Sequence, residues 1–194
     1  MDRSRPRDQI AVLAFLILFV LAYLSTATAW YAQRRPEYSH LRHTISELGE
    51  QGSADERSVS YLVFLPVGLA CLLVAWLSRT SHPGAPGLLV AVGAAYSLSA
   101  LFPCDPGTPL AGTWKNSIHN LAGGIAYAAI AYQLNDLADG PMGNYFQFTL
   151  WLLGAFLIAF VAGWPRQRIG LLQRLAEASI LIGIVLLLWQ SPSP

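Results

Sequence analysis

The feature that most constrains the fold is a series of six long apolar runs. The first five contain no charged residue, and each run has roughly the 17–25 residues with which a helix crosses about 30 Å of hydrocarbon. We therefore predict an all-α polytopic membrane protein, a single domain over residues 1–194, in which six transmembrane helices form one bundle. The predicted spans are residues 10–31, 60–78, 86–102, 117–135, 145–164 and 170–189.

The composition agrees with a chain that lies in lipid. Only 12% of its residues are charged and 54% are hydrophobic, whereas a soluble domain carries about 25% charged residues. The first run is too long for the core of a secretory signal peptide, so we expect it to remain as a helix. A net charge of +1 gives no electrostatic basis for binding nucleic acid. Tryptophans near the run ends are typical of an interfacial belt: Trp30, Trp114 and Trp164 at one set of ends, Trp76 and Trp189 at the other.

An even number of spans places both termini on one side of the membrane. The polar residues concentrate on the other side, in the connections between spans one and two, three and four, and five and six, which we call the first, second and third joints. Two signals for orientation disagree. The count of basic residues favours the joint side as cytoplasmic, while a basic tail before the first span is typical of a cytoplasmic N-terminus. We expect cytoplasmic termini in the plasma membrane. The terminal side has Arg3, Arg5, Arg7 and Arg79, and the joint side has Arg34, Arg35, Arg42, Arg57, Lys115, Arg166, Arg168 and Arg174.

The first joint contains "YSHLRHTISELG", which has the period of a helix. Tyr38, Leu41, Ile45 and Leu48 recur at steps of three, four and three residues, so they would share one apolar face. We predict a short interfacial helix between the first two spans, with this face toward the membrane.

The polar face of the same stretch supports two interpretations. His40, His43 and Glu47 fall together opposite the apolar residues. They would form either a solvated polar face or three ligands of one metal ion, because two histidines and a carboxylate can supply three zinc ligands. Thr44 and Glu47 also fit the S/T-x-x-E capping box, which would start a helix at that point instead.

The second joint begins with the turn sequence "CDPG". Pro103 ends the third span, and an aspartate, proline and glycine in this order are typical of a tight turn. Asp105 is therefore either a residue that forms the turn or a carboxylate held at the membrane edge for a site.

His119 and Asn120 lie about one turn inside the fourth span. Polar side chains at this depth usually face the interior of a bundle and mark a site, although a histidine bonded within the core is an equal alternative. If spans three and four form a hairpin, Asp105 and His119 meet near its top. Gly123 and Gly124 predict a close approach of another helix.

The last span contains two charged residues in its first turns. Arg174 and Glu177 are three residues apart, and a charge inside a bilayer requires a partner or a route to the interface. We expect them to pair with each other or with residues of the first and third joints.

The stretches "YSHLRHTISELG", "LFPCDPG", "HN" at a helix start and "RIGLLQRL" together resemble the domain of unknown function 998 family. The resemblance implies a six-span membrane protein of bacteria or archaea and implies no particular reaction. His40 and His43 are not part of the family pattern, and Thr108 stands where the family often has a second cysteine, which argues against a thiol pair on Cys104. The shared residues are Tyr38, Ser39, Ile45, Ser46, Leu48, Gly49, Phe102, Pro103, Cys104, Asp105, Pro106, Gly107 and His119.

These observations define a candidate site at one membrane face. We expect the protein to bind a small or lipid-like ligand there, or to act as an accessory membrane subunit, with the lipid bilayer as its surroundings. The alternative is a membrane-embedded hydrolase of a lipid substrate, with or without a metal. The candidate catalytic residues are Ser46, Glu47, Asp105 and His119, and the candidate ligand-binding residues are Tyr38, Ser39, His43, Asn120, Arg174 and Glu177.

Two known classes of membrane protein fit the sequence poorly. Ceramidase-like metal-dependent hydrolases carry a histidine pair on the last span, and this last span has no histidine. A haem held within the bundle needs axial ligands there, and His119 is the one histidine within a predicted span. The sequence specifies no cofactor and no oligomeric state.

Overall fold

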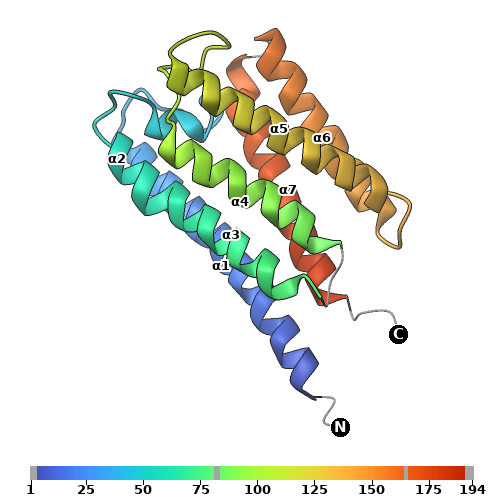
Figure 1. Cartoon of the computed structure of the whole chain (residues 1–194). Coiled ribbons are helices and arrows are strands. Elements are labelled where there is room, and N and C mark those ends of the chain that lie inside the picture. Colours follow the sequence, from blue (N-terminus) through green and yellow to red (C-terminus); the bar gives the residue numbers. More distant parts are fainter. Residues whose placement is uncertain (1–3, 81–83, 164–165, 191–194) are drawn as a thin grey trace.

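The structure is a computed structural model that describes residues 4–80, 84–163 and 166–190. It is all-α: within those ranges the chain forms long helices, short helical turns and loops, and no β-strand (Figure 1). The helical elements are α1 (Ser4–Gln33), η1 (Ser46–Gly49), α2 (Glu56–Ser58), η2 (Val59–Phe64), α3 (Leu65–Ser78), α4 (Ala85–Leu101), α5 (Trp114–Leu137), α6 (Gly143–Ala162), η3 (Arg166–Arg168) and α7 (Ile169–Trp189).

The long helices form a bundle in which neighbours in the chain are neighbours in space. α1 packs on α3, α3 on α4, α4 on α5, α5 on α6 and α6 on α7, and α7 closes the arrangement against α1. The start of α1 and the end of α7 lie at one end of the bundle (Figure 1). Residues 34–55 and 102–113 lie at the other end, which we call the joint end.

Each predicted span overlaps one long helix. Among the described residues, four helices are long and apolar enough to cross a membrane, namely residues 11–33, 56–78, 143–162 and 166–189. α4 is also apolar but has 17 residues. Trp164, at the end of the fifth predicted span, and Arg3 of the N-terminal tail lie outside the described residues.

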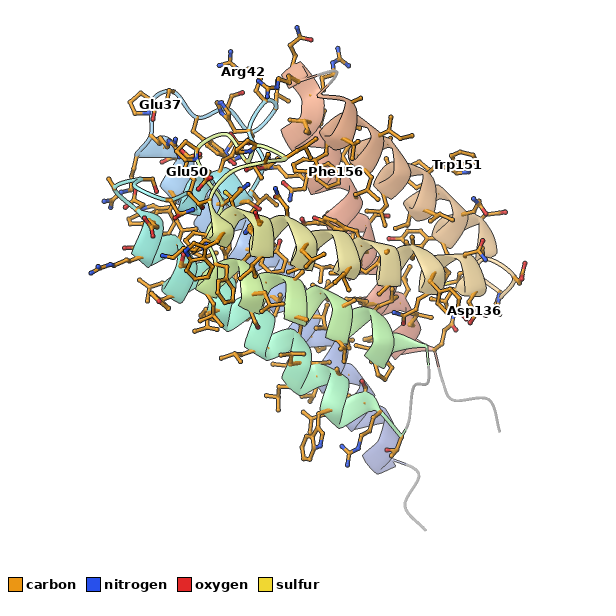
Figure 2. The ribbon with its side chains drawn as sticks, turned by 45° about the horizontal axis from the view of Figure 1, so that its top comes forward. Glu37, Arg42, Glu50, Asp136, Trp151 and Phe156 are labelled. Atoms are coloured by element: carbon orange, nitrogen blue, oxygen red, sulfur yellow. The ribbon has the colours of Figure 1, made fainter. Side chains whose placement is uncertain are left out.

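The outer surface of the bundle is apolar. Trp151 on α6 points outward with 70% of its surface exposed, whereas Phe156 on the same helix points inward with 3% exposed (Figure 2). Soluble monomers rarely expose large contiguous apolar patches, so this surface suits lipid. Other exposed apolar side chains are Phe15 and Phe19 on α1, Leu69, Leu73 and Trp76 on α3, Leu121 and Ile125 on α5, and Phe148 and Ile158 on α6.

α3 and α4 approach each other closely at a pair of glycines. A Cβ atom on Gly68 would lie 2.8 Å from the carbonyl oxygen of Gly93, and a Cβ atom on Gly93 would lie 2.9 Å from that of Gly68. Small residues allow this kind of backbone contact between membrane helices, so glycine at both positions fixes how α3 and α4 cross.

α2, η2 and α3 form one continuous rod with a π-helical segment at Val59–Phe64. Pro66 follows this segment, and it lacks the N–H that would bond to the Leu62 carbonyl in a regular α-helix. The hydroxyl of Tyr23 on α1 donates a hydrogen bond to that carbonyl. The irregular turn is therefore stabilised by the neighbouring helix.

The prediction of an interfacial helix over the first joint is wrong except for its last turn. Only Ser46–Gly49 is helical, as a single 3-10 turn, and Leu41 is 53% exposed although the predicted apolar face includes it. The reason is a competing set of hydrogen bonds. The Leu41 carbonyl accepts from the backbone N–H groups of Gly170 and Leu171 at 3.0 and 3.2 Å, so it pairs with α7 instead of with its own helix.

Candidate functional site

A cavity of about 270 Å³ lies at the joint end between α4, α5, α6 and α7. Each helix contributes residues at steps of three or four, which places them on one helix face. The joints contribute Thr44, Ile45, Ser46, Thr108 and Leu110. The helices contribute Val92, Ala95, Tyr96 and Ser99 from α4, His119, Asn120, Gly123, Gly124, Tyr127 and Ile130 from α5, Phe156, Leu157, Phe160 and Val161 from α6, and Gln173, Glu177, Ile180 and Leu181 from α7, with Phe64 from η2.

A carboxyl group forms the polar centre of this cavity. Glu177 accepts hydrogen bonds from the hydroxyl of Tyr127 at 2.7 Å and from the side-chain amide of Gln173 at 3.0 Å, both at Oε1. The hydroxyl of Tyr96 bonds to Oε2. These three donors come from α4, α5 and α7, so the carboxyl group joins three helices at one point.

Gln173 connects this cluster to the first joint. Its Oε1 atom accepts from the backbone N–H of Ile45 at 2.7 Å, while its Nε2 atom donates to Glu177. The side chain is 5% exposed. A movement of the first joint would therefore shift Gln173 and, through it, the hydrogen bond to the Glu177 carboxyl group.

Arg174 holds the first joint on α7. Its Nη1 atom donates to the carbonyls of His40, His43 and Gly170, each at 2.9 Å, and its Nη2 atom bonds to the Tyr38 hydroxyl. Burial raises the pKa of Tyr38 to about 12, against the opposing effect of the Arg174 charge, so this phenol stays neutral at ordinary pH.

The two charges of the last span find separate partners. Arg174 pairs with the first joint. Glu177 bonds to Gln173, which lies in the stretch that enters the last helix, and to tyrosines of α4 and α5, and no ion pair within the described residues joins it to Arg174. Arg174 instead extends to carbonyls that the irregular loop leaves without helical partners.

The polar face of the first joint forms local hydrogen bonds. Glu47 Oε1 accepts from the backbone N–H of Thr44 at 2.8 Å and from its hydroxyl at 3.0 Å, as the capping box predicts for the glutamate. His43 Nδ1 accepts from the backbone N–H of Ser39 at 2.8 Å. No three histidine, cysteine or acidic side chains in the described ranges gather closely enough to hold a metal ion. The interpretation of His40, His43 and Glu47 as three ligands of one metal ion therefore does not fit the structure.

Asp105 organises the second joint. Its Oδ1 atom accepts from the Gln51 side chain at 2.5 Å and from the Thr113 hydroxyl at 2.7 Å, and its Oδ2 atom accepts from the Thr113 backbone N–H at 2.6 Å. Its own N–H donates to Asn116 Oδ1 at 3.0 Å. The side chain therefore fixes the turn to the start of α5, and its contact with Gln51 reaches the first joint.

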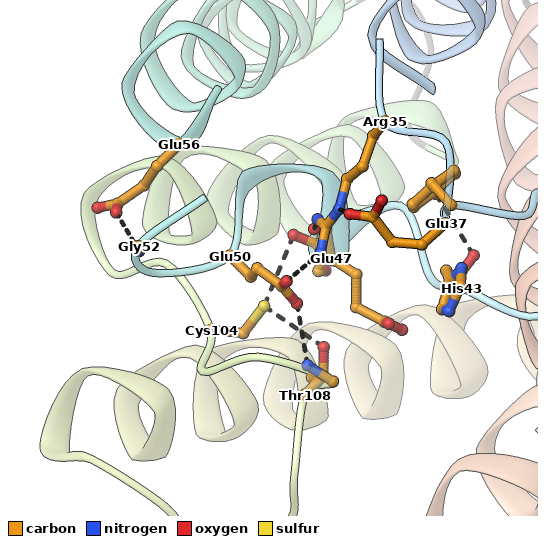
Figure 3. Close-up of polar contacts among 12 residues, drawn as sticks. Arg35, Glu37, His43, Glu47, Glu50, Gly52, Glu56, Cys104 and Thr108 are labelled. Atoms are coloured by element: carbon orange, nitrogen blue, oxygen red, sulfur yellow. Dashed lines mark hydrogen bonds and ion pairs between the residues drawn. The ribbon is translucent and has the colours of Figure 1, made fainter. Parts of the chain in front are cut away.

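A second set of contacts locks the same two joints together (Figure 3). Glu50 is 6% exposed; its carboxylate pairs with Arg35 and accepts from the backbone N–H of Gly107 at 2.9 Å. The Cys104 thiol lies 3.6 Å from the carbonyl oxygen of Ser46, and the Thr108 hydroxyl donates to its sulfur at 3.3 Å. Burial raises the pKa of the Cys104 thiol to about 12, and both cysteines are free.

His119 lines the cavity but does not pair with Asp105. Its Nδ1 atom lies 3.0 Å from the carbonyl oxygen of Phe102, and the residue is 7% exposed. Within the described part of the chain no hydrogen bond joins His119 to Asp105, whose carboxylate is engaged by Gln51 and Thr113. Asn120 donates to the carbonyl of Pro109 at 2.8 Å.

The structure thus divides the predicted site residues into two groups. Ser46, His119, Asn120 and Glu177 line the cavity. The other six hold the joints in place or lie within them: Tyr38, Ser39, His43, Glu47, Asp105 and Arg174.

Sequence reasoning missed Tyr96, Tyr127 and Gln173. A signal was present, since a tyrosine hydroxyl within a span needs a partner and Gln173 lies one turn before Glu177. The interpretation of Gly123 and Gly124 was wrong. A Cβ atom on either glycine would meet nothing within 4 Å, so they open the cavity wall instead of admitting another helix.

The comparisons with known proteins give a family and no activity. The family model described as protein of unknown function (DUF998) matches residues 12–190. The chain belongs to this family. The match extends from within α1 to the end of α7, so it covers the residues that line the cavity and those of both joints. No curated protein and no solved structure matches it, and the function is therefore argued from the site.

Proposed function

We propose that this DUF998 protein is a six-span protein of the plasma membrane, with cytoplasmic termini, that binds a small or lipid-like ligand in the joint-end cavity. The observation that carries the proposal is the cavity itself, which has a cluster of polar groups around Glu177 and apolar walls elsewhere. Ligand pockets are mostly apolar with a few convergent polar groups. Its volume of about 270 Å³ suits a small molecule or part of a single-chain lipid.

Helix length supports the six-span arrangement. At about 1.5 Å per residue, the 24 residues of α5 are long enough to cross the hydrocarbon. The 17 residues of α4 are at the short end of the range. α4 packs on α3 and α7, and α5 packs on α6, and these three partners are long and apolar enough to span. A membrane would have to accommodate them alongside those partners.

The cavity wall between α5 and α6 gives a route for an apolar chain. Gly124 on α5 and Val161 on α6 both line the cavity, and both are exposed on the outer surface. The open space at Gly123 and Gly124 leaves this wall thin. An alkyl chain in the lipid would therefore reach the cavity from the side, while the polar end of the ligand meets Glu177, His119 and Asn120.

The hydrolase alternative rests on Ser46 and His119, which both line the cavity. Nucleophilic catalysis needs a base within hydrogen-bond reach of the nucleophile and a third group that orients the base. Among the described residues no hydrogen bond joins Ser46 to His119, and Asp105 is bonded to Gln51 and Thr113. Binding is therefore the better supported function.

Photolabelling tests the proposal. A dodecanol that carries a diazirine in its chain is added to the purified protein, irradiated, and located by mass spectrometry. We expect labels on the cavity faces of α5 and α6, near Gly123 and Leu157, and a loss of these labels when unlabelled dodecanol is in excess. Labels spread evenly over outward residues such as Trp151, with no competition, would contradict a binding site.

A further inference from the structure

The inference drawn here rests on the proposed function and concerns which ligands the cavity takes. We infer that it selects amphiphiles with a positively charged amine head group, held by the Glu177 carboxylate among aromatic rings. Three observations lead to this assignment: the unequal use of the two carboxylate oxygens, the absence of lysine and arginine from the cavity lining, and the aromatic residues around the acid.

The carboxylate of Glu177 has room for one more donor. A carboxylate accepts about four hydrogen bonds, two on each oxygen. Tyr127 and Gln173 occupy Oε1, and Tyr96 alone bonds to Oε2. The side chain lines the cavity, so a donor on a bound ligand can approach the carboxyl group from the cavity.

No ion pair among the described residues neutralises this carboxylate. Its three hydrogen-bond donors are neutral, and the residues that line the cavity include no lysine or arginine. The charge of Arg174, one turn nearer to the joints, acts on Glu177 from outside the lining, but its hydrogen bonds go to three carbonyls and to Tyr38. A negative group in a medium of low dielectric attracts a cation far more strongly than it would in water.

The rings around the acid add to this attraction. Phe64, Tyr96, Tyr127, Phe156 and Phe160 line the cavity. Phe64 and Tyr96 are 5.8 Å apart by their ring centroids, and Tyr127 and Phe156 are 5.5 Å apart. The faces of aromatic rings attract cations, and groups of such rings are used to bind ammonium ligands. A carboxylate among them favours an amine over an anion or a neutral head group.

The apolar part of the cavity requires that this cation carries a chain. Leu157 and Val161 on α6 line the wall that they share with Gly123 and Gly124 on α5, and Val161 and Gly124 are exposed on the outer surface. A head group at Glu177 would place its alkyl chain along this wall. A small amine without a chain would leave these residues without contact.

A pair of probes with matched chains tests the inference. Dodecylamine and dodecanol are compared by displacement of tritiated dodecanol from wild-type protein, with free concentrations corrected for uptake by the micelles. We expect dodecylamine to bind at least about tenfold more tightly, which corresponds to about 1.4 kcal/mol. Glu177→Gln should reduce that preference to less than about twofold, and Glu56→Gln, a change at the joint end outside the cavity, should leave it intact.

The outcomes separate this inference from the proposed function. Equal binding of both probes by the wild type would overturn the charge selectivity and leave the binding site standing. Absence of saturable binding by either probe would contradict both. If Glu177→Gln does not fold, carbodiimide labelling of Glu177 in the wild type replaces it, with N,N-dimethyldodecylamine as the cationic probe, because a tertiary amine forms no stable amide with the activated carboxyl group. This probe should protect the carboxyl group at roughly a tenth of the dodecanol concentration, and equal protection would count against the inference.

Discussion

Glu50 accepts a hydrogen bond from the backbone N–H of Gly107 at 2.9 Å, and this contact joins the first joint to the second. The same carboxylate pairs with Arg35, which also donates to the Glu47 carbonyl at 2.6 Å. The polar residues between the apolar helices therefore have a structural role, because they hold the first and second joints together (Figure 3).

The Glu50 contacts predict a loss of stability when its side chain is removed. Glu50→Ala leaves Arg35 and the Gly107 N–H without their partner, and we expect the free energy of unfolding to fall by about 1–3 kcal/mol. Glu37→Ala is the matched control, because Glu37 also pairs with Arg35 but its side chain is 69% exposed; it should have little effect. Thermal unfolding in detergent measures both, and equal losses would contradict the lock between the joints.

Gly170 predicts a second effect on the first joint. A Cβ atom there would lie 2.2 Å from the His43 carbonyl oxygen, which is backbone and cannot move aside freely. We expect Gly170→Ala to destabilise the protein by about 1–3 kcal/mol. Gly154→Ala on α6, where a Cβ atom meets nothing within 4 Å, should raise helix stability by about 0.5–1 kcal/mol. Melting temperatures that shift in the same direction for both variants would show that the loop does not pack on Gly170.

How much of this could be foreseen differs between helices and joints. Each long helix could be predicted from the length of its apolar run, because backbone N–H and C=O groups in lipid must bond to each other, and a helix satisfies them within one segment. The first joint does not follow, since the periodic spacing of Tyr38, Leu41, Ile45 and Leu48 competes with donors on α7 that lie far away in the chain, such as Gly170 and Arg174. Local pattern contains no information about Gly170 and Arg174.

For the site as well, the sequence pattern identifies polar residues but not the partners that they bond to in the bundle. Ser46, His119 and Glu177 stand out as polar residues beside apolar runs, and all three line the cavity. Asp105 stands out equally and instead serves the turn, as one of its two interpretations predicts. Tyr96 and Tyr127 were overlooked because a tyrosine within a span is compatible with lipid, and only the bundle shows that both hydroxyls meet one carboxyl group.

The Cys104 thiol should be unreactive in the folded protein. Because burial raises its pKa to about 12, almost no thiolate is present at pH 7.5, and the thiolate is the reactive form. In a Cys71→Ala background we expect alkylation by iodoacetamide to be at least about a hundredfold slower than after unfolding, and to accelerate as the pH rises toward 12. Rapid labelling of native protein at pH 7.5 would show that the second joint opens in solution.

The orientation of the bundle is tested with reporters. The proposal predicts that a reporter active only in the cytoplasm is active when fused after Pro194 and inactive when inserted beside Ser53, and that a reporter active only outside the cytoplasm gives the opposite pattern. Reversed activities would place the joint end in the cytoplasm. Activity of the same reporter at both positions would contradict an even number of spans.

The most direct measurement is the binding of tritiated dodecanol to purified wild-type, Gly123→Leu and Gly154→Leu proteins. Both glycines face open space, but Gly123 lines the cavity and Gly154 does not, so the two variants differ in whether the added side chain fills the site. Wild type and Gly154→Leu should bind about one molecule per chain, and Gly123→Leu should lose at least about tenfold in affinity. Undiminished binding by Gly123→Leu, with its fold intact, would contradict the assignment of the cavity as the ligand site.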